Sequence, residues 1–272
     1  MNDAVSRVDI HSHLVPGVDD GARTLDDALE SIGRMVALGI RTIVTTPHFD
    51  ASLMSGPHGG RRMEEVETGF ARLEEAVARR FPEIELGHGF EVMLDDPHAD
   101  LSDSRLRMAG TRFVLVEWPR MRVPPGTSAV LARLRDQGLT PVVAHPERYR
   151  EGGDVRTLAQ SWREAGAFLQ VNHGSLTGRY GAAPERRAWS LLEEGLVDYL
   201  ASDHHGRPHL DLQLDEVERR LEDFDAEEQL GMLVRTNPLR LLEDQEPLPV
   251  RPVQVSHGWR ERLRRLIRPE VS

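Results

Sequence analysis

The stretch Val8-Asp9-Ile10-His11-Ser12-His13 combines a short run typical of a β-strand with two histidines at its end. In an extended chain, residues two apart point to the same side, so His11 and His13 can ligate one metal ion together. A single His-x-His pair has little specificity, because such histidines also occur as solvent-facing or hydrogen-bonded polar residues. The stretch therefore predicts a strand, and its meaning depends on what the other strand ends carry.

Short β-rich runs alternate with longer amphipathic runs along the chain, which is the pattern of parallel βα units. We predict seven strands, at 8–10, 42–45, 84–87, 113–117, 141–144, 168–171 and 199–201. We predict helices between Thr24 and Gly39 and at 62–80, 128–137, 155–165, 184–194, 212–221 and 226–236. Segment 50–60, rich in glycine and serine, is expected to be a mobile surface loop. The pattern favours one barrel-like α/β domain, with a doubly wound open sheet as the alternative.

Ligand-type side chains follow six of the predicted strands. Beyond the two histidines of the first strand, the chain presents Thr45-Thr-Pro-His48, Gly89-Phe-Glu91, Val116-Glu117-Trp118, Ala144-His145-Pro-Glu-Arg148 and Ser202-Asp203-His-His205. Parallel α/β folds bind their ligands at the carboxyl ends of the strands. The repetition predicts that these side chains converge on a polynuclear metal centre in the mouth of the barrel.

Composition narrows the chemistry further. The 272 residues include no cysteine, and all 34 basic residues are arginine. Thiolate nucleophiles and cysteine-ligated metals are therefore excluded, and a metal must be held by nitrogen and oxygen. The formal charge of −11 argues against a general nucleic-acid surface, because binding to a polyanion rests on basic residues, but it does not exclude an anionic substrate.

Two features of the chain bear on its location and domain boundaries. The longest apolar runs fall far short of the ~20 residues of a membrane span, and the start lacks a secretory signal, so we expect a cytoplasmic protein. We divide the chain into a domain at 1–245 and a tail at 246–272, which is proline-rich and then basic. Segment 259–268 carries five arginines and one glutamate with an apolar helical face. It is expected to be either a terminal helix packed on the domain or a segment that contacts a membrane or an acidic partner.

The ordered motifs resemble a known family. They are Val8-Asp-Ile-His-Ser-His13, Pro16-Gly-Val-Asp-Asp-Gly21, Thr45-Thr-Pro-His48, Gly89-Phe-Glu91, Ala144-His-Pro-Glu-Arg-Tyr149, Val171-Asn172, Ala201-Ser-Asp-His-His205 and Thr236-Asn-Pro238. Together, over residues 7–242, they resemble the PHP (polymerase and histidinol phosphatase) superfamily. Within it they are most similar to the bacterial manganese-dependent protein-tyrosine phosphatases of capsule and exopolysaccharide operons. The resemblance implies a distorted TIM-like (β/α)7 barrel of the PHP type.

Carried over residue by residue, the resemblance also implies a set of metal ligands: His11, His13, His48, Glu91, Glu117, His145, Asp203 and His205. Glu91 is the natural bridging carboxylate, and His204 fills the variable place of an Asp-x-His motif. Five imidazoles and three carboxylates suit Mn, Fe, Co or Zn better than Ca or Mg. The resemblance implies manganese, with two or three ions per chain.

Three further residues are candidates for catalysis. Arg148 and Arg207 follow ligand positions, and arginine donates two parallel hydrogen bonds to a phosphate. The alternative for both is a surface ion pair, especially for Arg148 beside Glu147. Asp20, or its neighbour Asp19, is expected either to orient a metal-bound histidine or a water, or only to shape the turn.

These expectations define a function and its rivals. We predict a metal-dependent protein-tyrosine phosphatase that hydrolyses phosphotyrosine through a metal-activated water, without a phosphoenzyme, and regulates exopolysaccharide or capsule synthesis. The resemblance implies a bacterial tyrosine autokinase as its phosphoprotein partner. The alternatives are another PHP phosphoesterase, such as a histidinol-phosphate phosphatase, and a non-catalytic metal-binding module that docks a kinase.

Overall fold

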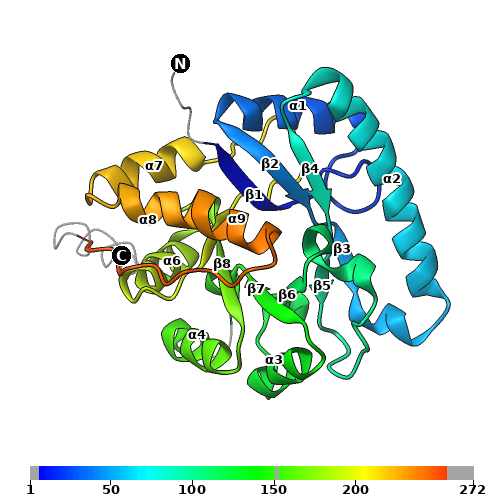
Figure 1. The fold of residues 1–272 in the computed structure, drawn as a ribbon. Coiled ribbons are helices and arrows are strands. Elements are labelled where there is room, and N and C mark those ends of the chain that lie inside the picture. The colour runs from blue at the N-terminus through cyan, green and yellow to red at the C-terminus, as the bar shows by residue number, and fades with distance from the viewer. Residues whose placement is uncertain (1–5, 151–152, 256–272) are drawn as a thin grey trace, which may run out of the picture.

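The computed structural model describes residues 6–150 and 153–255 and contains two parallel sheets (Figure 1). The strands of the first sheet are, in order, β1 (Arg7–Ser12), β2 (Ile40–Thr45) and β4 (Glu85–His88). The strands of the second are, in order, β3 (His48–Asp50), β5 (Glu91–Met93), β6 (Phe113–Glu117), β7 (Thr140–Ala144), β8 (Phe168–Asn172) and β9 (Tyr199–Ala201). All neighbouring strands run parallel. The prediction of an α/β fold with parallel strands is confirmed.

The prediction of seven strands was wrong in one respect, because β3 and β5 are separate strands. Each follows an earlier strand after a two-residue break, at Thr46-Pro47 and at Gly89-Phe90. Proline has no N–H to donate to a ladder, and a Cβ at Gly89 would lie 2.8 Å from Met108 Cα. Across the break, β3 pairs with β5 at the same sequence separation as β2 with β4. The break therefore bends one strand pair without changing its register.

The residues that follow β9, the last strand of the six-stranded sheet, contact β1 of the other sheet. Just after β9, the Asp203 N–H donates to the His11 carbonyl oxygen at 2.9 Å, and the His13 N–H donates to the His204 carbonyl oxygen at 2.8 Å. An isolated parallel bridge joins Ser12 to His204. Backbone hydrogen bonds thus connect the two sheets at the point where the predicted ligands lie.

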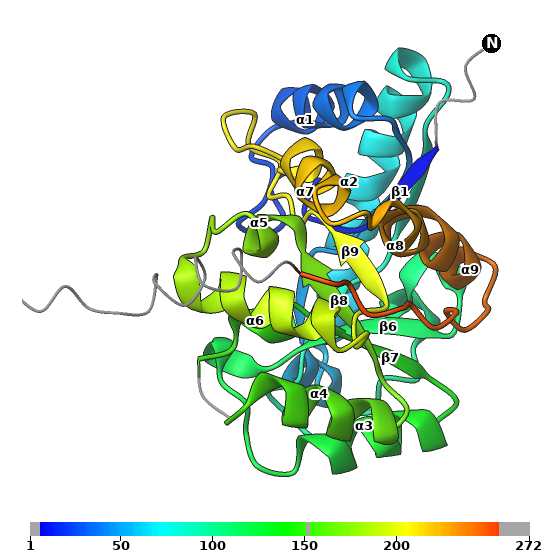
Figure 2. The same ribbon diagram turned by 90° about the vertical axis from the view of Figure 1, so that its left-hand side faces the viewer.

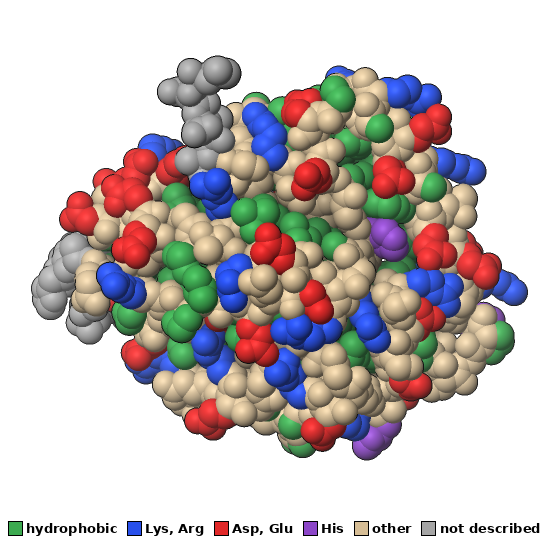
Figure 3. Space-filling model, in the orientation of Figure 1, with side chains coloured by type: hydrophobic (Ala, Val, Ile, Leu, Met, Phe, Trp, Pro, Cys, Tyr) green, Lys and Arg blue, Asp and Glu red, His purple; other side chains and the backbone are tan. Residues whose placement is uncertain are grey.

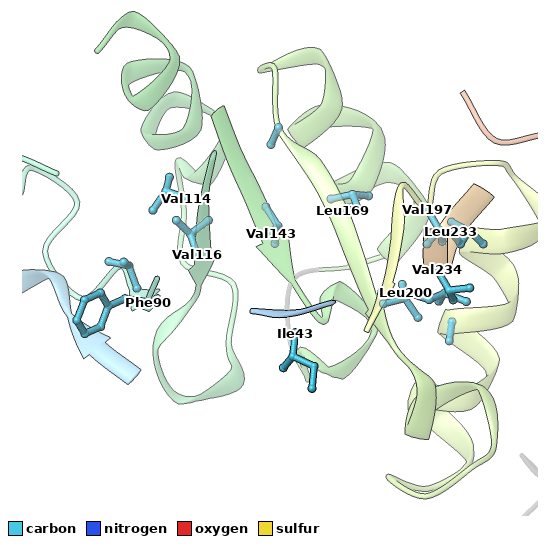
Figure 4. Packing of buried hydrophobic residues seen from close by; sticks show 14 of the residues in the cluster. Ile43, Phe90, Val114, Val116, Val143, Leu169, Val197, Leu200, Leu233 and Val234 are labelled. Atoms are coloured by element: carbon cyan, nitrogen blue, oxygen red, sulfur yellow. The ribbon is translucent and has the colours of Figure 1, made fainter. Parts of the chain in front are cut away.

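Alternate residues of the strands pack into two hydrophobic clusters. Val114, Val116 and Leu169 belong to a large cluster that includes the buried faces of the helices (Figure 4). Phe113 and Leu115 point the other way, into a smaller inner cluster that also holds residues of both sheets: Val8, Ile10, Val44, Val142, Ala144, Tyr199 and Ala201. Since strand side chains alternate between two faces, the inner cluster lies on one face of the sheets and the helices pack on the other.

Helices lie outside the strands (Figure 2). They are α1 (Leu25–Ala37), α2 (His58–Arg80), α3 (Thr127–Asp136), α4 (Val155–Glu164), α5 (His173–Leu176), α6 (Ala182–Glu193), α7 (Leu214–Glu222), α8 (Glu227–Gly231) and α9 (Asn237–Leu242). A π-helical turn, Met232–Thr236, joins α8 to α9. Helix α1 begins as predicted, with a capping box between Thr24 and Asp27.

Segment 50–60, expected to be a loop, is largely helical. A 3₁₀ helix spans Ala51–Ser55, and α2 begins at His58, four residues before the predicted start. Gly59 lies against this 3₁₀ helix, where a Cβ would come within 2.8 Å of the Leu53 carbonyl oxygen. Packing between the two helices outweighs the low helix propensity of the glycines.

After α9 the chain crosses the surface beside α6 (Figure 1). Val250, Val253 and Val255 are buried, and the Val253 N–H donates to the Leu192 carbonyl oxygen at 3.0 Å. The predicted amphipathic segment 259–268 lies outside the described residues. Among the described helices, none has the length and apolar character needed to cross a membrane. Arginines and acids are interspersed over the face shown in Figure 3.

The first prediction concerns His173, which is buried at the start of α5. Burial lowers its pKa to about 3, whereas an unfolded histidine has a pKa near ~6.5. As pH falls below the unfolded value, the unfolded chain takes up a proton that the folded chain does not, so stability falls with pH. When the pH falls from 7 to 5, the free energy of unfolding should therefore decrease by about 2 kcal/mol less in His173→Gln than in the parent protein.

Urea unfolding at the two pH values, at fixed metal content, measures this difference. His98→Gln, in an exposed loop, is the matched control and should behave like the parent. Equal pH dependence in the parent and His173→Gln would contradict a buried neutral histidine.

Candidate metal centre

Six of the eight side chains predicted as ligands lie at or just after the carboxyl ends of β1, β6, β7 and β9, whereas His48 and Glu91 are the first residues of β3 and β5. All eight fall into four overlapping groups. Within each group, one nitrogen or oxygen atom per residue lies within 4.8 Å of the others. The groups are His11–Glu91–His145, His11–His13–Asp203, His48–Glu91–Glu117 and His13–Asp20–His48–His205. The third of these joins residues of three neighbouring strands, β3, β5 and β6. Asp20, predicted for a catalytic role, is thus also in position to ligate.

Glu91 lies at the centre of the cluster. Its Oε1 is 2.8 Å from His145 Nε2, and its Oε2 is 3.3 Å from His11 Nε2, 3.4 Å from His13 Nε2 and 3.1 Å from His48 Nδ1. Two ligands bound to one transition-metal ion at about 2.1 Å lie roughly 3 Å apart, so these separations suit ligands of a shared ion. A carboxylate with imidazoles at both oxygens is suited to bridge two ions.

A second carboxylate, Asp203, lies beside the same histidines. Asp203 Oδ1 is 3.5 Å from His11 Nε2, from His13 Nε2 and from His205 Nδ1. Asp20 Oδ1 lies 3.4 Å from His205 Nε2 and 3.5 Å from the Nε2 of His48. The cluster therefore extends from the buried Glu91 outward to Asp20, whose side chain is 64% exposed.

The backbone adopts unusual conformations to aim two of these side chains. His145 and Asp203 have φ of 35° and 49°, in the left-handed region that residues with a Cβ avoid. Such a conformation costs about 1–3 kcal/mol per residue and persists where the surrounding structure enforces it. In β1, the register shifts between Asp9 and Ser12, which brings His11 and His13 toward the carboxylates although Ile10 faces the inner core.

Polar side chains behind the cluster fix the orientation of its members. Asp19 Oδ2 lies 2.8 Å from His13 Nδ1, and Gln170 Oε1 lies 2.8 Å from His11 Nδ1. The amide of Gln170 donates to Asn172 Oδ1 at 2.9 Å, and the amide of Asn172 donates to Asp203 Oδ2 at 2.7 Å. This chain of hydrogen bonds on β8 links two of the predicted ligands. Such partners set the ring orientation and basicity of ligating histidines.

Asp19 and Asp20 were both candidates for orienting a metal-bound histidine or a water. Asp19 orients a histidine, whereas Asp20 lies among the ligand-type atoms. Gln170 and Asn172 carry no predicted role, although they are two residues apart at a strand end and therefore share a face. That spacing is the feature of the sequence from which their shared position could have been predicted. Asp9 supports the backbone, because its Oδ1 accepts hydrogen bonds from the His11 and Ser202 N–H groups, both at 3.2 Å.

The electrostatics of the cluster favour positive charge. Burial lowers the pKa of His13, but the nearby carboxylates of Asp19, Asp203 and Glu91 outweigh it and leave that pKa well above its usual value. Burial raises the pKa of Glu91, but the surrounding histidines leave it well below its usual range. Glu91 Oε2 and His48 Nδ1 are buried without a hydrogen-bond partner among the described residues. Buried nitrogen and oxygen atoms that lack a hydrogen-bond partner are suited to coordinate a cation.

Both predicted arginines line one hollow of about 260 Å³ at the outer side of the cluster, together with Tyr180 and Asp203. Arg148 Nη1 donates to Asp203 Oδ2 at 2.6 Å, and its guanidinium carbon lies 4.4 Å from the centre of the Tyr180 ring. Arg207 Nη2 donates to the Asp20 carbonyl oxygen at 2.7 Å. The Glu147 carboxylate instead accepts from Ser175 Oγ at 2.6 Å, so it does not take Arg148 as its partner. We call this hollow the mouth.

His204 does not belong to the cluster. It is buried, and burial lowers its pKa to about 3. None of the four groups among the described residues includes it, in agreement with its place in the Asp-x-His motif. Its backbone completes the bridge to β1, so its contribution is structural.

Fold and site together define a class: a parallel α/β protein with clustered nitrogen and oxygen ligands at its strand ends and arginines at the opening. Comparison with known proteins identifies the group within this class. The family described as "Capsular polysaccharide synthesis, CpsB/CapC" matches residues 7–243, and the chain belongs to this family. The resemblance drawn from the motifs is confirmed.

Named relatives show what this family contains. The tyrosine-protein phosphatase YwqE of Bacillus subtilis is 30% identical over 200 residues, covering 73% of this chain and 77% of that protein. The tyrosine-protein phosphatase CpsB of Streptococcus pneumoniae is 25% identical over 249 residues, covering 88% of this chain and 99% of that protein.

Solved structures agree with this result. A structure from a study of YwqE and CpsB, described as unique metal-dependent tyrosine phosphatases, matches with a TM-score of 0.71 and 27% identity over 92% of this chain and all of that one. An amidohydrolase from Mycoplasma synoviae matches with a TM-score of 0.55 and 14% identity over 97% of this chain and 95% of that one. The second match concerns the fold alone.

The second prediction tests the contact behind His13. Asp19→Asn removes the negative charge that holds the ring, and outer partners of this kind are worth about 10–100-fold in metal affinity. We expect Mn²⁺ titration calorimetry to show a loss of that size. Asp136→Asn, exposed at the end of α3, is the control and should bind like the parent. Unchanged affinity in a folded Asp19→Asn protein would contradict the positioning role.

Proposed function

We propose that this protein is a metal-dependent protein-tyrosine phosphatase that acts in capsule or exopolysaccharide synthesis. The observation that carries the proposal is the position of two arginines at the mouth of a cluster that unites nine ligand-type side chains, the eight predicted ligands and Asp20. Membership of a family whose relatives are named tyrosine-protein phosphatases supports the substrate class. The alternative functions lack a comparable observation in their favour.

The proposal includes the architecture. We infer that the two sheets form a distorted TIM-like (β/α)7 barrel, in which β2 with β3, and β4 with β5, each count as one bent strand. The inner cluster, which draws side chains from both sheets, supports this interpretation. The bridge from Ser12 to His204 supports it too, because it connects the last strand to the first. A barrel of this kind presents its strand ends around one opening.

The residues present fit a bound metal. We propose the following ligands: His11, His13, His48, Glu91, Glu117, His145, Asp203 and His205. Five imidazoles and three carboxylates suit manganese, iron, cobalt or zinc better than calcium or magnesium, and we propose two or three ions. Manganese is our choice among them. Divalent ions bound there would activate a water and neutralise phosphoryl charge.

The side chains at the mouth would handle the substrate. Arg148 and Arg207 provide N–H groups that bind and orient phosphoryl oxygens, and both stay charged at all working pH values. Asp20, between His48 and His205, is able to orient a water at the edge of the cluster. A phenol has a pKa near ~10, so a tyrosyl leaving group departs more easily than an aliphatic alcohol and depends less on a strong general acid.

A chain without cysteine cannot form a thiophosphate intermediate, which suits direct hydrolysis. We propose a phosphotyrosine protein as substrate, specifically a bacterial tyrosine autokinase.

The cytoplasmic location expected from the sequence stays a prediction, as does contact with a membrane or partner through the segment from residue 246 onward.

The third prediction tests the function directly. Exhaustive chelation should abolish hydrolysis of p-nitrophenyl phosphate and of a phosphotyrosine peptide, and added Mn²⁺ should restore both, with elemental analysis of each sample. Histidinol phosphate should be a much poorer substrate than the peptide. Full activity after chelation, or a phosphorylated enzyme trapped by rapid quench, would contradict the proposal. A metal-loaded protein without turnover would leave only the docking alternative.

The fourth prediction concerns Arg148→Lys, which keeps the charge but loses the planar fork of donors. Hydrogen bonds to charged groups contribute about 1.5–3 kcal/mol, so kcat/KM for a phosphotyrosine peptide should fall about 10- to 100-fold. Metal content, measured in the same samples, should stay within error of the parent. If metal is lost with activity, Arg148 acts by holding Asp203 and not by binding phosphate.

A further inference from the structure

A second hollow lies next to the mouth and shares a wall with it. Its volume is about 390 Å³, and the residues that matter for its chemistry are Met121, Arg148, Arg150, Tyr180, Pro184 and Arg187. Arg148 and Tyr180 line both hollows. The guanidinium of Arg148, packed over the Tyr180 ring, therefore forms the ridge between them. We call the second hollow the arginine hollow.

The lining of the arginine hollow is rich in positive charge. Among the described residues, it includes three arginines and no acid. Two larger hollows elsewhere on the protein pair their arginines with acids: Asp215 and Glu216 in one, Glu67 and Glu74 in the other. In a chain with a formal charge of −11, three arginines in one hollow, of which Arg148 alone has a carboxylate partner among the described residues, are not explained by average composition. Such a local excess attracts an anion.

Hydrogen bonds fix the segments that carry two of these arginines. Arg187, on α6, donates from Nε to the Glu147 carbonyl oxygen at 2.6 Å. The backbone N–H of Arg150 donates to the Met121 carbonyl oxygen at 3.0 Å. Among the described residues, neither Arg150 nor Arg187 has a carboxylate within 4.0 Å of its guanidinium nitrogens. Their terminal N–H groups are thus available to an anionic ligand.

We propose that the arginine hollow is a specificity subsite that binds the anionic side chain of a residue flanking the phosphotyrosine of the substrate. This proposal rests on the proposed phosphatase function. When the phosphotyrosine occupies the mouth, the peptide continues past the ridge of Arg148 and Tyr180. Consecutive residues of an extended peptide advance by ~3.3 Å, so a nearby side chain reaches the adjoining hollow.

The chemistry of the hollow defines its ligand class. Guanidinium groups bind carboxylate and phosphoryl oxygens through paired hydrogen bonds. Met121 and Pro184 offer apolar surface to the aliphatic stem of the side chain. A glutamate and a phosphorylated residue share this anionic chemistry, and the experiment separates the two.

The test compares phosphotyrosine peptides that differ at single flanking positions, from four residues before to four after the phosphotyrosine, with glutamate, glutamine or phosphoserine. The parent, loaded with Mn²⁺, should prefer an anionic residue over glutamine by about tenfold in kcat/KM at one or more positions, and less at high salt because exposed charges are screened. Arg150→Gln and Arg187→Gln should each reduce this preference at least threefold. Hydrolysis of the glutamine peptide and of p-nitrophenyl phosphate should stay within twofold of the parent.

Arg72→Gln, exposed on α2, removes one arginine elsewhere and should leave the preference intact. A larger preference for phosphoserine than for glutamate would identify the ligand as a phosphoryl group, and the reverse would identify a carboxylate. A parent that hydrolyses aryl phosphate without discriminating among the peptides would overturn the subsite alone. Loss of all turnover in the metal-loaded parent would instead overturn the phosphatase function. Because Arg187 also holds Glu147, Arg150→Gln serves as the variant that keeps the test decisive if Arg187→Gln fails to fold.

Discussion

Glu91 is a fully buried carboxylate whose charge must be balanced inside the protein, and the site is arranged around that requirement. Imidazole nitrogens of His11, His13, His48 and His145 surround its two oxygens. A carboxylate removed from water costs several kcal/mol unless positive charge or hydrogen-bond donors replace the solvent. Protonated imidazoles supply that charge, and so does a divalent cation held by the same atoms. Protons and cations therefore compete for the cluster, and its affinity for metal falls as the pH falls.

The irregular parts of the fold are the parts that bring the predicted ligands to Glu91. The strand breaks at Thr46-Pro47 and Gly89-Phe90 come immediately before His48 and Glu91. Left-handed backbone at His145 and Asp203, and the register shift in β1, act at the other strand ends. These distortions interrupt the hydrogen bonds between strands and place residues in backbone conformations that they otherwise avoid. They persist because the strands below them are buried on both faces, between the inner cluster and the helices.

The sequence was sufficient to predict the positions of the other strands and the residues that cluster, because short apolar runs are followed by ligand-type side chains at six of the seven predicted strands. It was not sufficient for β3 and β5, since Thr-Pro and Gly-Phe resemble the start of a loop. The helical structure in segment 50–60 depends on packing, which glycine and serine content does not reveal. The role of Gln170 is defined by contact with His11, far away in the sequence. Likewise, the arginine hollow exists only because α6 lies beside the residues that follow β7.

Net charge and local charge have opposite consequences in this protein. A formal charge of −11 would repel a phosphate dianion if it were evenly spread, yet the mouth and the adjoining hollow are lined by arginines. The field in a hollow is governed by the groups that line it, and guanidinium groups remain charged across the working pH range. The charge of these arginines is thus insensitive to pH, whereas the cluster would exchange cations for protons as pH falls. In the proposed phosphatase, acid would therefore act on turnover through the metal cluster, while the arginines keep their charge.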